Sequence, residues 1–449
     1  MALLLAAMMA VPLSSCKDET SAGPAHDPNK PIVCESFYPK GGPISTQVVL
    51  TGQNFGSKVD EVQVFFNDKE APVVGVSGDH MLVLAPRLPG ENVVIKVVIG
   101  NQASTFNDFF DYEIQTNIST VCGGDASAQT NPDGTISLSE AQFKSEFEWG
   151  IQVDGNGNIF FGFNADADGS THNYRYVANI AADKLKRLEE AGTFLTFSQF
   201  AYDPIDDRVY HIQSNIGNNE YWWHDVNNDF VAMDKGEIGW KDHDTDFVPD
   251  GLAVFAARKA AAMRKSDHMF YTRSYGGYME RFDPATGIGE NLTKLLGGVG
   301  IGSTKGSTLG MAWDKTNDNY LYFSNDEMHC IYRTDFSTGR TSVAAGQAGQ
   351  AGYLDGPLTT ALFNKPMQMA VDSEGNIYVA DAGNHCIRKI NLETAYVSTV
   401  AGIPQSSGYV NGTSEFAKFN EPTGLCIDKD DIIYVSDRKN HAIRRVAIE

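Results

Sequence analysis

A long repeat near the C-terminus constrains the fold more than any other feature of the sequence. The stretch FNKPMQMAVDSEGNIYVADAGNHCIRKI (363–390) aligns without a gap with FNEPTGLCIDKDDIIYVSDRKNHAIRRV (419–446). His385 and His441 therefore stand 56 residues apart, and His329 belongs to a third copy another 56 residues upstream. Because each copy holds short apolar runs between turn residues, the chain is expected to combine several similar β-rich units.

Weaker copies extend the repeat towards the N-terminus. One aromatic residue marks the second apolar run of each copy: Phe160, Tyr210, Tyr271, Tyr322, Tyr378 and Tyr434. The spacings between these markers are 50, 61, 51, 56 and 56 residues. Six units of this length, each with several strands, predict a β-propeller or a β-solenoid. The Asp-x-x-Gly-Asn and Asp-Pro-x-x-Gly turns make hairpins, which favours the blades of a six-bladed propeller.

The last unit is one strand short, so the ring needs another strand to close. This unit ends near Val446, with no room for a fourth strand. The segment 118–143, which precedes the first unit, resembles the segment 397–419. We therefore predict that residues near 118–122 supply the missing strand, because an open blade would leave backbone groups unpaired.

The repeat resembles the NHL family, whose pattern runs from F-x-x-P-x-G-hydrophobic-x-D through G-N-hydrophobic-Y-V-A-D to N-x-I-R. The last unit matches it at Phe419, Pro422, Gly424, Asp428, Tyr434, Asp437, Asn440, Ile443 and Arg444. The match is strong in the last two units, fair in the fourth and poor in the first three. The resemblance implies a propeller, to which we assign residues 116–449.

Residues 31–115 are predicted to form a different domain. Short apolar or alternating runs, such as 48–50 and 93–98, lie between turns rich in Gly, Pro and Asn. This pattern is typical of a small β-sandwich. Through GGP at 41–43 and GQNFG at 52–56, the segment resembles an immunoglobulin-like IPT/TIG domain. That resemblance implies a spacer or a binding module.

The N-terminus predicts a targeting segment. Residues 1–15 form an apolar stretch too short to span a bilayer and typical of a signal peptide. The sequence LSSC, which ends at Cys16, resembles a bacterial lipobox, in which the cysteine is cleaved free and acylated. Residues 16–30 would then be a flexible tether, and the KDE at 17–19 resembles a signal for export to the surface of Gram-negative bacteria. No Lys or Arg precedes the apolar run, and a packed or frayed apolar N-terminus is the alternative.

The predicted location is therefore the outer membrane, as a surface-exposed lipoprotein, with an anchor facing the periplasm as the second choice. The formal net charge of −22 repels phosphate backbones and anionic headgroups. Nucleic acid is thus not an expected partner, and the lipid anchor is the only expected membrane contact. None of the 6 cysteines forms a CxxC pair, which argues against a zinc ribbon or a thioredoxin-like site.

The Asp, Asn, His and Arg that recur in the repeat have two interpretations. In one, His329, His385 and His441 share a metal ion. Packed sheets lie about 10 Å apart and zinc ligands about 2.1 Å from the metal, so equivalent residues converge only near the central axis. In the other, short polar side chains bond the turn backbone and the arginine pairs with a neighbouring blade. We expect the second.

Two acidic loops are candidate calcium sites. The first places carboxylates at positions 1, 3, 5 and 9 of DHDTDFVPD: Asp242, Asp244, Asp246 and Asp250. Alternating carboxylates can encircle a hard cation, but Phe247 stands where the sharp turn usually has Gly. The second, NADADG at 164–169, keeps the Gly, while His172 and Arg175 replace later acidic ligands. Solvated acidic loops are the alternative for both.

Aromatic residues are unusually dense in the second and third units. The candidate ligand-binding residues are Tyr221, Trp222, Trp223, His224, Trp240, Arg273, Tyr275 and Tyr278. Flat aromatic faces beside acidic and amide groups suit sugars, which offer CH patches and hydroxyls. The alternative is that these rings fill gaps between irregular blades.

Together these features predict a non-catalytic binding module at the bacterial surface, with a glycan or a protein as its partner. The long loops 346–366 and 402–422 are expected to line the mouth of the ring. The rival hypothesis is an enzyme, because some propellers related to NHL proteins are lyases or lactonases with an axial metal. Asp154, Asp203 and His211 are candidate ligands for such a metal. A structural scaffold is the third alternative.

Overall fold

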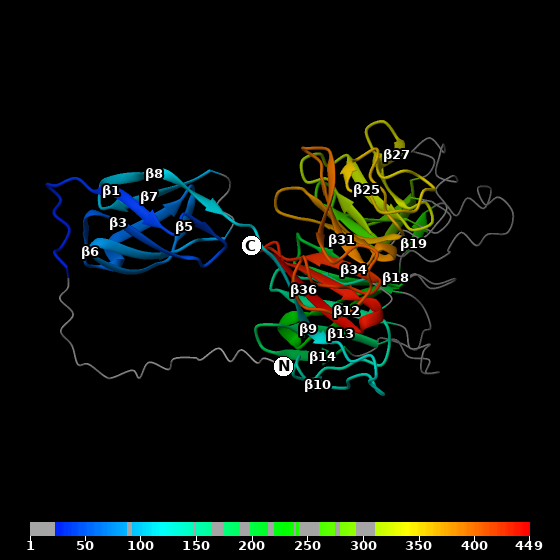
Figure 1. Ribbon diagram of the computed structural model, residues 1–449. Coiled ribbons are helices and arrows are strands. Elements are labelled where there is room, and N and C mark those ends of the chain that lie inside the picture. Colours follow the sequence, from blue (N-terminus) through cyan, green and yellow to red (C-terminus); the bar gives the residue numbers. More distant parts are fainter. Residues whose placement is uncertain are drawn as a thin grey trace, which may run out of the picture. The chain divides into compact units, whose positions relative to one another are not determined.

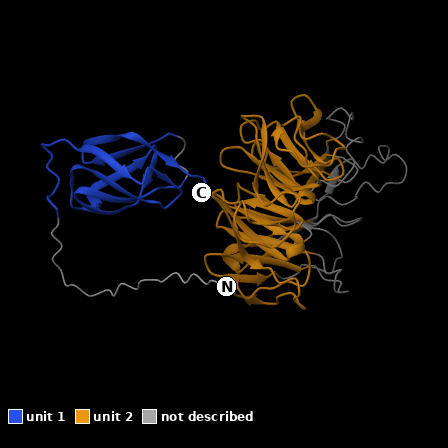
Figure 2. Ribbon diagram, in the orientation of Figure 1, with its two compact units in different colours: residues 1–114, 449 blue, residues 115–448 orange. Residues whose placement is uncertain are grey.

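The protein has an all-β fold, as the sequence predicts, with 55% of the residues that the structure describes in strands and 3% in helices. The computed structural model describes residues 23–87, 92–147, 150–163, 174–188, 198–213, 220–237, 239–241, 260–273, 279–292 and 310–449. The chain divides into two compact units, formed by residues 1–114 with residue 449 and by residues 115–448 (Figure 2). In the described part of the chain, no helix has the length and apolar character that a membrane crossing requires.

The first unit is a sandwich of two sheets. One has the strand order β1-β3-β6 and the other β2-β8-β7-β4-β5. The strands are β1 (Val33–Tyr38), β2 (Gly41–Gly42), β3 (Gln47–Gly56), β4 (Val62–Phe66), β5 (Lys69–Ala71), β6 (Val73–Leu84), β7 (Val93–Ile99) and β8 (Gln102–Tyr112), with a 3-10 turn η1 (Val59–Glu61). Buried and half-buried residues alternate along β7, because only one face of the sheet meets the core. Phe66 and Phe110 pack edge to face there, with ring centroids 5.3 Å apart.

The second unit is a six-bladed propeller (Figure 1). Blade 1 holds β11 (Gln152–Val153), β12 (Asn158–Phe163), β13 (Tyr174–Asn179) and β14 (Lys184–Arg187). Blade 2 holds β15 (Ser198–Asp203), β16 (Arg208–Gln213), β17 (Glu220–Asp225) and β18 (Val231–Glu237). Blade 3 holds β20 (Ala261–Arg264), β21 (Met269–Arg273), β22 (Met279–Phe282) and β23 (Ile288–Asn291). Blade 4 holds β24 (Met311–Trp313), β25 (Tyr320–Asn325), β26 (Cys330–Asp335) and β27 (Arg340–Ala345). Blade 5 holds β29 (Pro366–Val371), β30 (Ile377–Asp381), β31 (Cys386–Asn391) and β32 (Tyr396–Ala401). Blade 6 holds β34 (Pro422–Ile427), β35 (Ile433–Asp437) and β36 (Ala442–Ile448). Short 3-10 turns are η2 (Val226–Asn228), η5 (Ala382–Asn384) and η6 (Arg438–Asn440).

The first strands of the blades surround the axis. β11, β15, β20, β24, β29 and β34 contact one another in this order, and β34 contacts β11 again, which completes the ring. Every residue of the second strands β12, β30 and β35 is buried. A second strand meets a neighbouring blade on each of its faces, so its sequence holds a continuous apolar run and does not alternate. β30 and β35 each end in a buried aspartate, Asp381 and Asp437. The six aromatic marker residues all lie on second strands and are buried.

The ring closes as predicted. β9 (Thr116–Gly123) pairs with β36 in antiparallel register, from Gly123 opposite Ala442 to Thr116 opposite Ile448. β9 is thus the fourth strand of blade 6, and Figure 1 shows it beside β36 although the two are far apart in the sequence. This confirms a six-bladed propeller closed by a strand from its N-terminal side.

Four blades carry a fifth strand on their outer edge. It comes each time from the segment that precedes the first strand of the blade, in blade 6 from the loop 402–422. These strands are β10 (Thr135–Ile136), β19 (Gly239–Lys241), β28 (Gly356–Pro357) and β33 (Gly412–Thr413). The loops 346–366 and 402–422 therefore reach the outer edge of the blade that follows, where they cover backbone groups that an edge strand would expose.

Gln368 joins three blades near the axis. Its side-chain oxygen accepts the backbone N–H groups of Ile151 at 3.0 Å and of Leu425 at 3.2 Å, and its Nε2 donates to the carbonyl of Ile151 at 2.8 Å. Gln368 lies on β29 of blade 5, Leu425 on β34 of blade 6, and Ile151 directly before β11 of blade 1. The ring is thus closed twice, by β9 in blade 6 and by this buried amide at the first strands.

Candidate functional site

The repeated Asp, Asn and Arg form a buried network in blade 5. Oδ2 of Asp381 accepts from Nη1 of Arg388 at 2.9 Å and from Nδ2 of Asn384 at 2.8 Å. Arg388 also donates to Asp355 at 2.7 Å and to two carbonyls in the loop before the blade. The side chains of Asp381 and Arg388 are both fully buried. Burial raises the pKa of Asp381 to about 6, against the effect of Arg388, so this carboxyl is ionised at neutral pH.

Blade 6 repeats this network and blade 4 lacks its charges. Nη1 of Arg444 donates to Asp437 at 2.7 Å, and Nδ2 of Asn440 donates to the same oxygen at 2.8 Å. In blade 4 the corresponding positions hold Asn325 and Tyr332, at the same register relative to the cysteine that opens the third strand. Blade 4 thus lacks both the negative charge of the aspartate and the positive charge of the arginine. This is expected, because a buried charge without its partner would be strongly destabilising.

The repeated histidines join neighbouring blades. Nδ1 of His385 accepts the backbone N–H of Glu421 in blade 6 at 3.0 Å, and Nδ1 of His329 makes the equivalent contact to blade 5 at 3.1 Å. Nδ1 of His441 instead lies 2.9 Å from the carbonyl oxygen of Phe143, so it carries a proton and donates. The set therefore stabilises blades, in agreement with the second interpretation. The residue that reaches the next blade is the histidine, whereas the arginine bonds the loop in front of its own blade.

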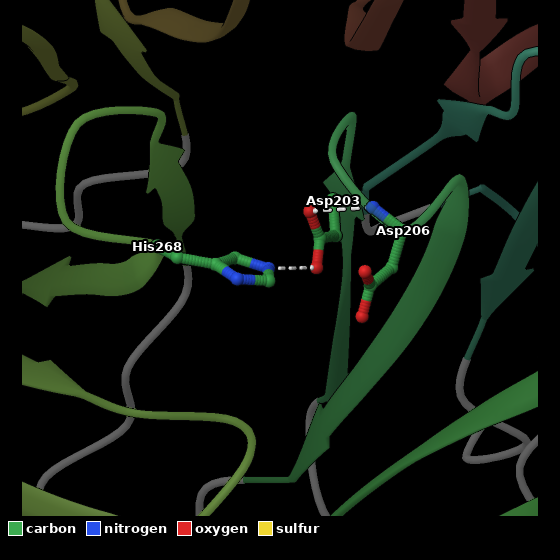
Figure 3. Close-up of side chains that lie close together, drawn as sticks. All are labelled: Asp203, Asp206 and His268. Carbon is green, nitrogen blue, oxygen red and sulfur yellow. Dashed lines mark hydrogen bonds and ion pairs between the residues drawn. The ribbon is translucent and has the colours of Figure 1, made fainter.

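Among the described residues, Asp203, Asp206 and His268 form the one group of three potential metal ligands (Figure 3). Asp203 ends β15, Asp206 lies in the turn that follows, and His268 directly precedes β21 of the next blade. One ligand atom from each residue lies within 4.8 Å of the others. Asp203 is fully buried, while the side chains of Asp206 and His268 are 40% and 38% exposed.

The contacts within this group are those of a link between turns. Nε2 of His268 lies 2.8 Å from Oδ2 of Asp203, whose Oδ1 accepts the backbone N–H of Ile205 at 2.9 Å. Asp206 accepts from Arg208 at 3.3 Å. Ligand atoms around a tetrahedral zinc ion lie about 3.4 Å apart. A metal ion would therefore have to break the contact of His268 with Asp203 and draw the three groups together.

Other pairs of blades are linked at the same turns. Oδ1 of Asp207 in blade 2 accepts the N–H of Gly155 in blade 1 at 2.7 Å. Oδ1 of Asp431 in blade 6 accepts the N–H of Ser373 in blade 5 at 2.7 Å. The contact of His268 with blade 2 is a further member of this series, in which a side chain replaces a backbone donor. The group is therefore accounted for by blade packing.

The three candidate ligands of an axial metal are separate from one another. Asp154 caps the turn after β11, where its Oδ1 accepts the N–H groups of Asn156 and Asn158 at 3.0 and 2.8 Å. Burial raises the pKa of Asp154. Asp203 caps the equivalent turn of blade 2, and His211 lies on the second strand β16, away from the strands that surround the axis. Asp154, Asp203 and His211 thus form no common group of ligand atoms.

The described members of the aromatic cluster lie mainly between blades. Tyr221, Trp222 and His224 are buried, and the hydroxyl of Tyr221 donates to the carbonyl of Pro284 at 3.1 Å. Trp223 is half-buried, with the guanidinium carbon of Arg208 4.2 Å from its ring centroid. These positions favour the packing interpretation for this part of the cluster.

Arg273 is also buried, with its guanidinium 4.8 Å from the ring centroid of Phe323 in blade 4. Burial lowers the pKa of Arg273 to about 10. The remaining predicted site residues lie outside the residues that the structure describes, including the side chain of Trp240. They are Cys16, Asn164 to Gly169, His172, Asp242, Asp244, Asp246, Asp250, Tyr275 and Tyr278.

Gln368 is the residue at the axis that sequence analysis missed. Its signal is a departure from the repeat, because the pattern F-x-x-P-x-G places Gly where blade 5 has Gln368. Blade 6 keeps the pattern with Gly424, and a Cβ atom there would lie 3.0 Å from Cγ2 of Ile151. Gly424 of blade 6, which has no side chain, and the amide side chain of Gln368 in blade 5 thus both fit against the segment in front of blade 1 that contains Ile151.

The fold and its repeats define a two-unit β protein with an immunoglobulin-like domain and a propeller. Residues 32–112 match the IPT/TIG domain, and residues 363–390 and 419–445 match the NHL repeat. The chain therefore carries an N-terminal IPT/TIG domain and NHL repeats, as the sequence motifs predict.

Solved structures resemble this chain over both units. A structural genomics protein of unknown function from Bacteroides thetaiotaomicron is 26% identical, with a TM-score of 0.71 over 95% of this chain and 100% of that chain. An auxiliary nutrient binding protein from Bacteroides ovatus is 21% identical, with a TM-score of 0.61 over the same shares of the two chains. Among curated proteins, NHL repeat-containing protein 2 of Bos taurus is 34% identical over 100 residues, which are 22% of this chain and 14% of that protein. The chain thus spans a small part of that longer relative.

Proposed function

We propose that the protein is a non-catalytic binding protein of the bacterial cell surface, anchored through Cys16 and specific for a nutrient glycan. The observation that carries this proposal is a likeness to an auxiliary nutrient binding protein that extends over 95% of this chain, and so over the IPT/TIG domain as well as the propeller. A propeller alone occurs with many functions. The combination of a spacer-like domain with a propeller is more specific.

The packing of the described residues supports binding over catalysis. Asp154 and Asp203 accept backbone hydrogen bonds in turns, and His211 stacks on Trp222, so the three groups proposed for an axial metal have structural contacts. Arg388 and Arg444 hold the loops of blades 5 and 6 with buried ion pairs. Such a ring is a rigid support for a ligand site.

A glycan array probed with the soluble chain from residue 23 tests ligand binding. We expect selective binding of one glycan class, reduced at least about tenfold by the paired substitution Tyr275→Ala/Tyr278→Ala, since stacking on a sugar needs the aromatic face. Tyr396→Ala is the matched control, because Tyr396 is 46% exposed on β32 of a regular blade. Failure to bind any glycan, together with capture of one specific protein, would replace the glycan by a protein partner.

A separate experiment tests the anchor. Metabolic labelling with an alkyne fatty acid is expected to modify the chain in its native host and to be lost in Cys16→Ser. Protease treatment of whole cells should then remove the protein from the cell surface. Labelling that persists in Cys16→Ser would refute the anchor and leave glycan binding untouched.

A further inference from the structure

The interface between blades 1 and 2 has an apolar part and a polar part. Its apolar part consists of Phe160, Val177, Leu188, Phe200 and Val209. Beside it lie four polar residues that are each more than nine-tenths buried: Arg175 of blade 1, and His211, Trp222 and His224 of blade 2. We refer to these four residues as the polar seam.

Aromatic stacking holds the polar seam together. The imidazole of His211 stacks on the indole of Trp222, with centroids 4.2 Å apart and planes at 17°. The guanidinium carbon of Arg175 lies 5.0 Å from the centroid of the same indole. The ring of Phe200 contacts the imidazole of His211, with ring centroids 5.1 Å apart. The seam therefore bridges the two blades by stacked faces.

The hydrogen-bonding capacity of the seam is only partly used. Within the described part of the chain, both ring nitrogens of His211, Nε1 of Trp222 and Nε2 of His224 are buried and have no hydrogen-bond partner. Nδ1 of His224 lies 3.2 Å from the carbonyl oxygen of Phe230, so this nitrogen carries the proton and Nε2 has a lone pair. A second proton on either imidazole would create a buried cation without an acceptor, which is costly in free energy.

The charges around the two imidazoles oppose protonation as well. The positive charge of Arg175 on β13 lowers the pKa of both imidazoles. Lys186 on β14 lowers the pKa of His224, and His224 lowers that of His211. All these groups are cationic or become so. Burial, reinforced by Arg175, lowers the pKa of His211 well below its usual value. Burial likewise lowers the pKa of His224 to about 4.

We propose that the polar seam is acid-sensitive, so that blades 1 and 2 separate locally when His211 and His224 take up protons, while blades 5 and 6 stay closed. In the separated state both imidazoles reach water and regain their ordinary affinity for protons, which favours that state in acid. His329 and His385 of the regular blades have less effect, because both are partly exposed and each makes one hydrogen bond to a neighbouring blade.

The sign and size of the effect follow from the two protonation equilibria. The pKa of His224 is lower in the closed seam than in the separated state. The closed seam therefore has its full stability above pH 6.5 and loses stability as the pH falls towards 4. At pH 5 a histidine that is exposed to water in the separated state is mostly protonated, whereas a histidine of the closed seam is mostly neutral. For His224 alone, the opening equilibrium therefore rises about 30-fold at pH 5.

Hydrogen–deuterium exchange of the full chain at pH 7 and pH 5, corrected for intrinsic rates, tests the proposal. Peptides from β12 to β17 are expected to gain at least about tenfold in opening at pH 5, and peptides from β29 to β36 less than about threefold. An equal gain in both regions, or a gain in neither, would overturn the proposal.

Two variants then assign the effect to the histidines. His211→Phe keeps an aromatic ring against Trp222, and His224→Asn keeps a donor at the position of Nδ1 for the carbonyl of Phe230. Each folded variant is expected to reduce the acid-induced gain of β12 to β17 by about an order of magnitude, whereas the control His329→Gln leaves it unchanged. If one variant loses protection already at pH 7, the other decides. An unchanged gain in a folded variant contradicts the assignment, and the wild-type comparison of regions stands by itself.

Discussion

Exchanging the buried ion pair of blade 5 for the neutral pair of blade 4 tests how the repeated network stabilises the propeller. The changes are Asp381→Asn, Arg388→Tyr and the two combined, which reproduce Asn325 and Tyr332 of blade 4. Only the combined variant has a precedent within the molecule. The single variants each leave one charge behind, so the set forms a double-mutant cycle.

The expected magnitudes follow from burial. Arg388→Tyr leaves the fully buried carboxylate of Asp381 without its cation, which costs about 3 to 5 kcal/mol. Asp381→Asn costs about 2 kcal/mol, because Arg388 keeps Asp355 as a partner and that side chain is 33% exposed. The double variant should cost about 2 kcal/mol, from the lost bonds to the preceding loop. The coupling free energy is then about 3 to 5 kcal/mol in favour of having both charges or neither.

Tryptophan fluorescence during unfolding by guanidinium measures these differences in the propeller alone, because all 5 tryptophans lie in residues 115–448. Arg340→Tyr is the control for a surface arginine, since Arg340 is exposed on β27, and should change stability by less than about 0.5 kcal/mol. A coupling free energy below about 0.5 kcal/mol would refute the charge-balance argument. It would mean that the arginine acts through its loop bonds alone.

Three further predictions concern the closure and the links of the ring. A chain that begins at Gln115 should keep a cooperatively folded propeller, whereas one that begins at Gly124 should lose it, because β36 then lacks its partner; thermal unfolding distinguishes the two. Gln368→Leu should lower the free energy of unfolding by about 2 to 4 kcal/mol, because it leaves backbone groups of Ile151 without partners, and a small effect in denaturant titration would show that water replaces the amide. Burial lowers the pKa of His385, so its contribution is complete above pH 6.5 and falls in acid; His385→Gln should flatten that part of the stability profile, and an unaltered profile would contradict the link to Glu421.

The architecture was predictable because it repeats. Second strands are buried on both faces and therefore leave continuous apolar runs around a marker such as Tyr378 or Tyr434, which fixes the number of blades. The closing strand was predictable for a related reason. The last blade lacked a strand, and the only unassigned copy of one lay near residue 118. Both inferences use local patterns, which survive in a sequence.

The contacts between blades could not be predicted in the same way. The outer strand Gly356–Pro357 is too short for any periodicity. The stack of His211 on Trp222 depends on which face of each strand turns towards blade 1, and a strand buried on both faces carries no such signal. Gln368 is an intermediate case, because its departure from the Gly of the repeat is visible while its partners are not.

The closing strand has a consequence for biosynthesis. Gly123 leaves the ribosome about 320 residues before its partner Ala442, which at 5 to 20 residues per second is a delay of about 16 to 64 s. During that time β9 has an unpaired edge, and blades 1 to 5 can form only an open arc. The ring becomes complete only after β36 has been made, so a translocated chain would complete it on the far side of the membrane. A chaperone that covers one exposed strand early in synthesis would therefore influence the yield of the whole propeller.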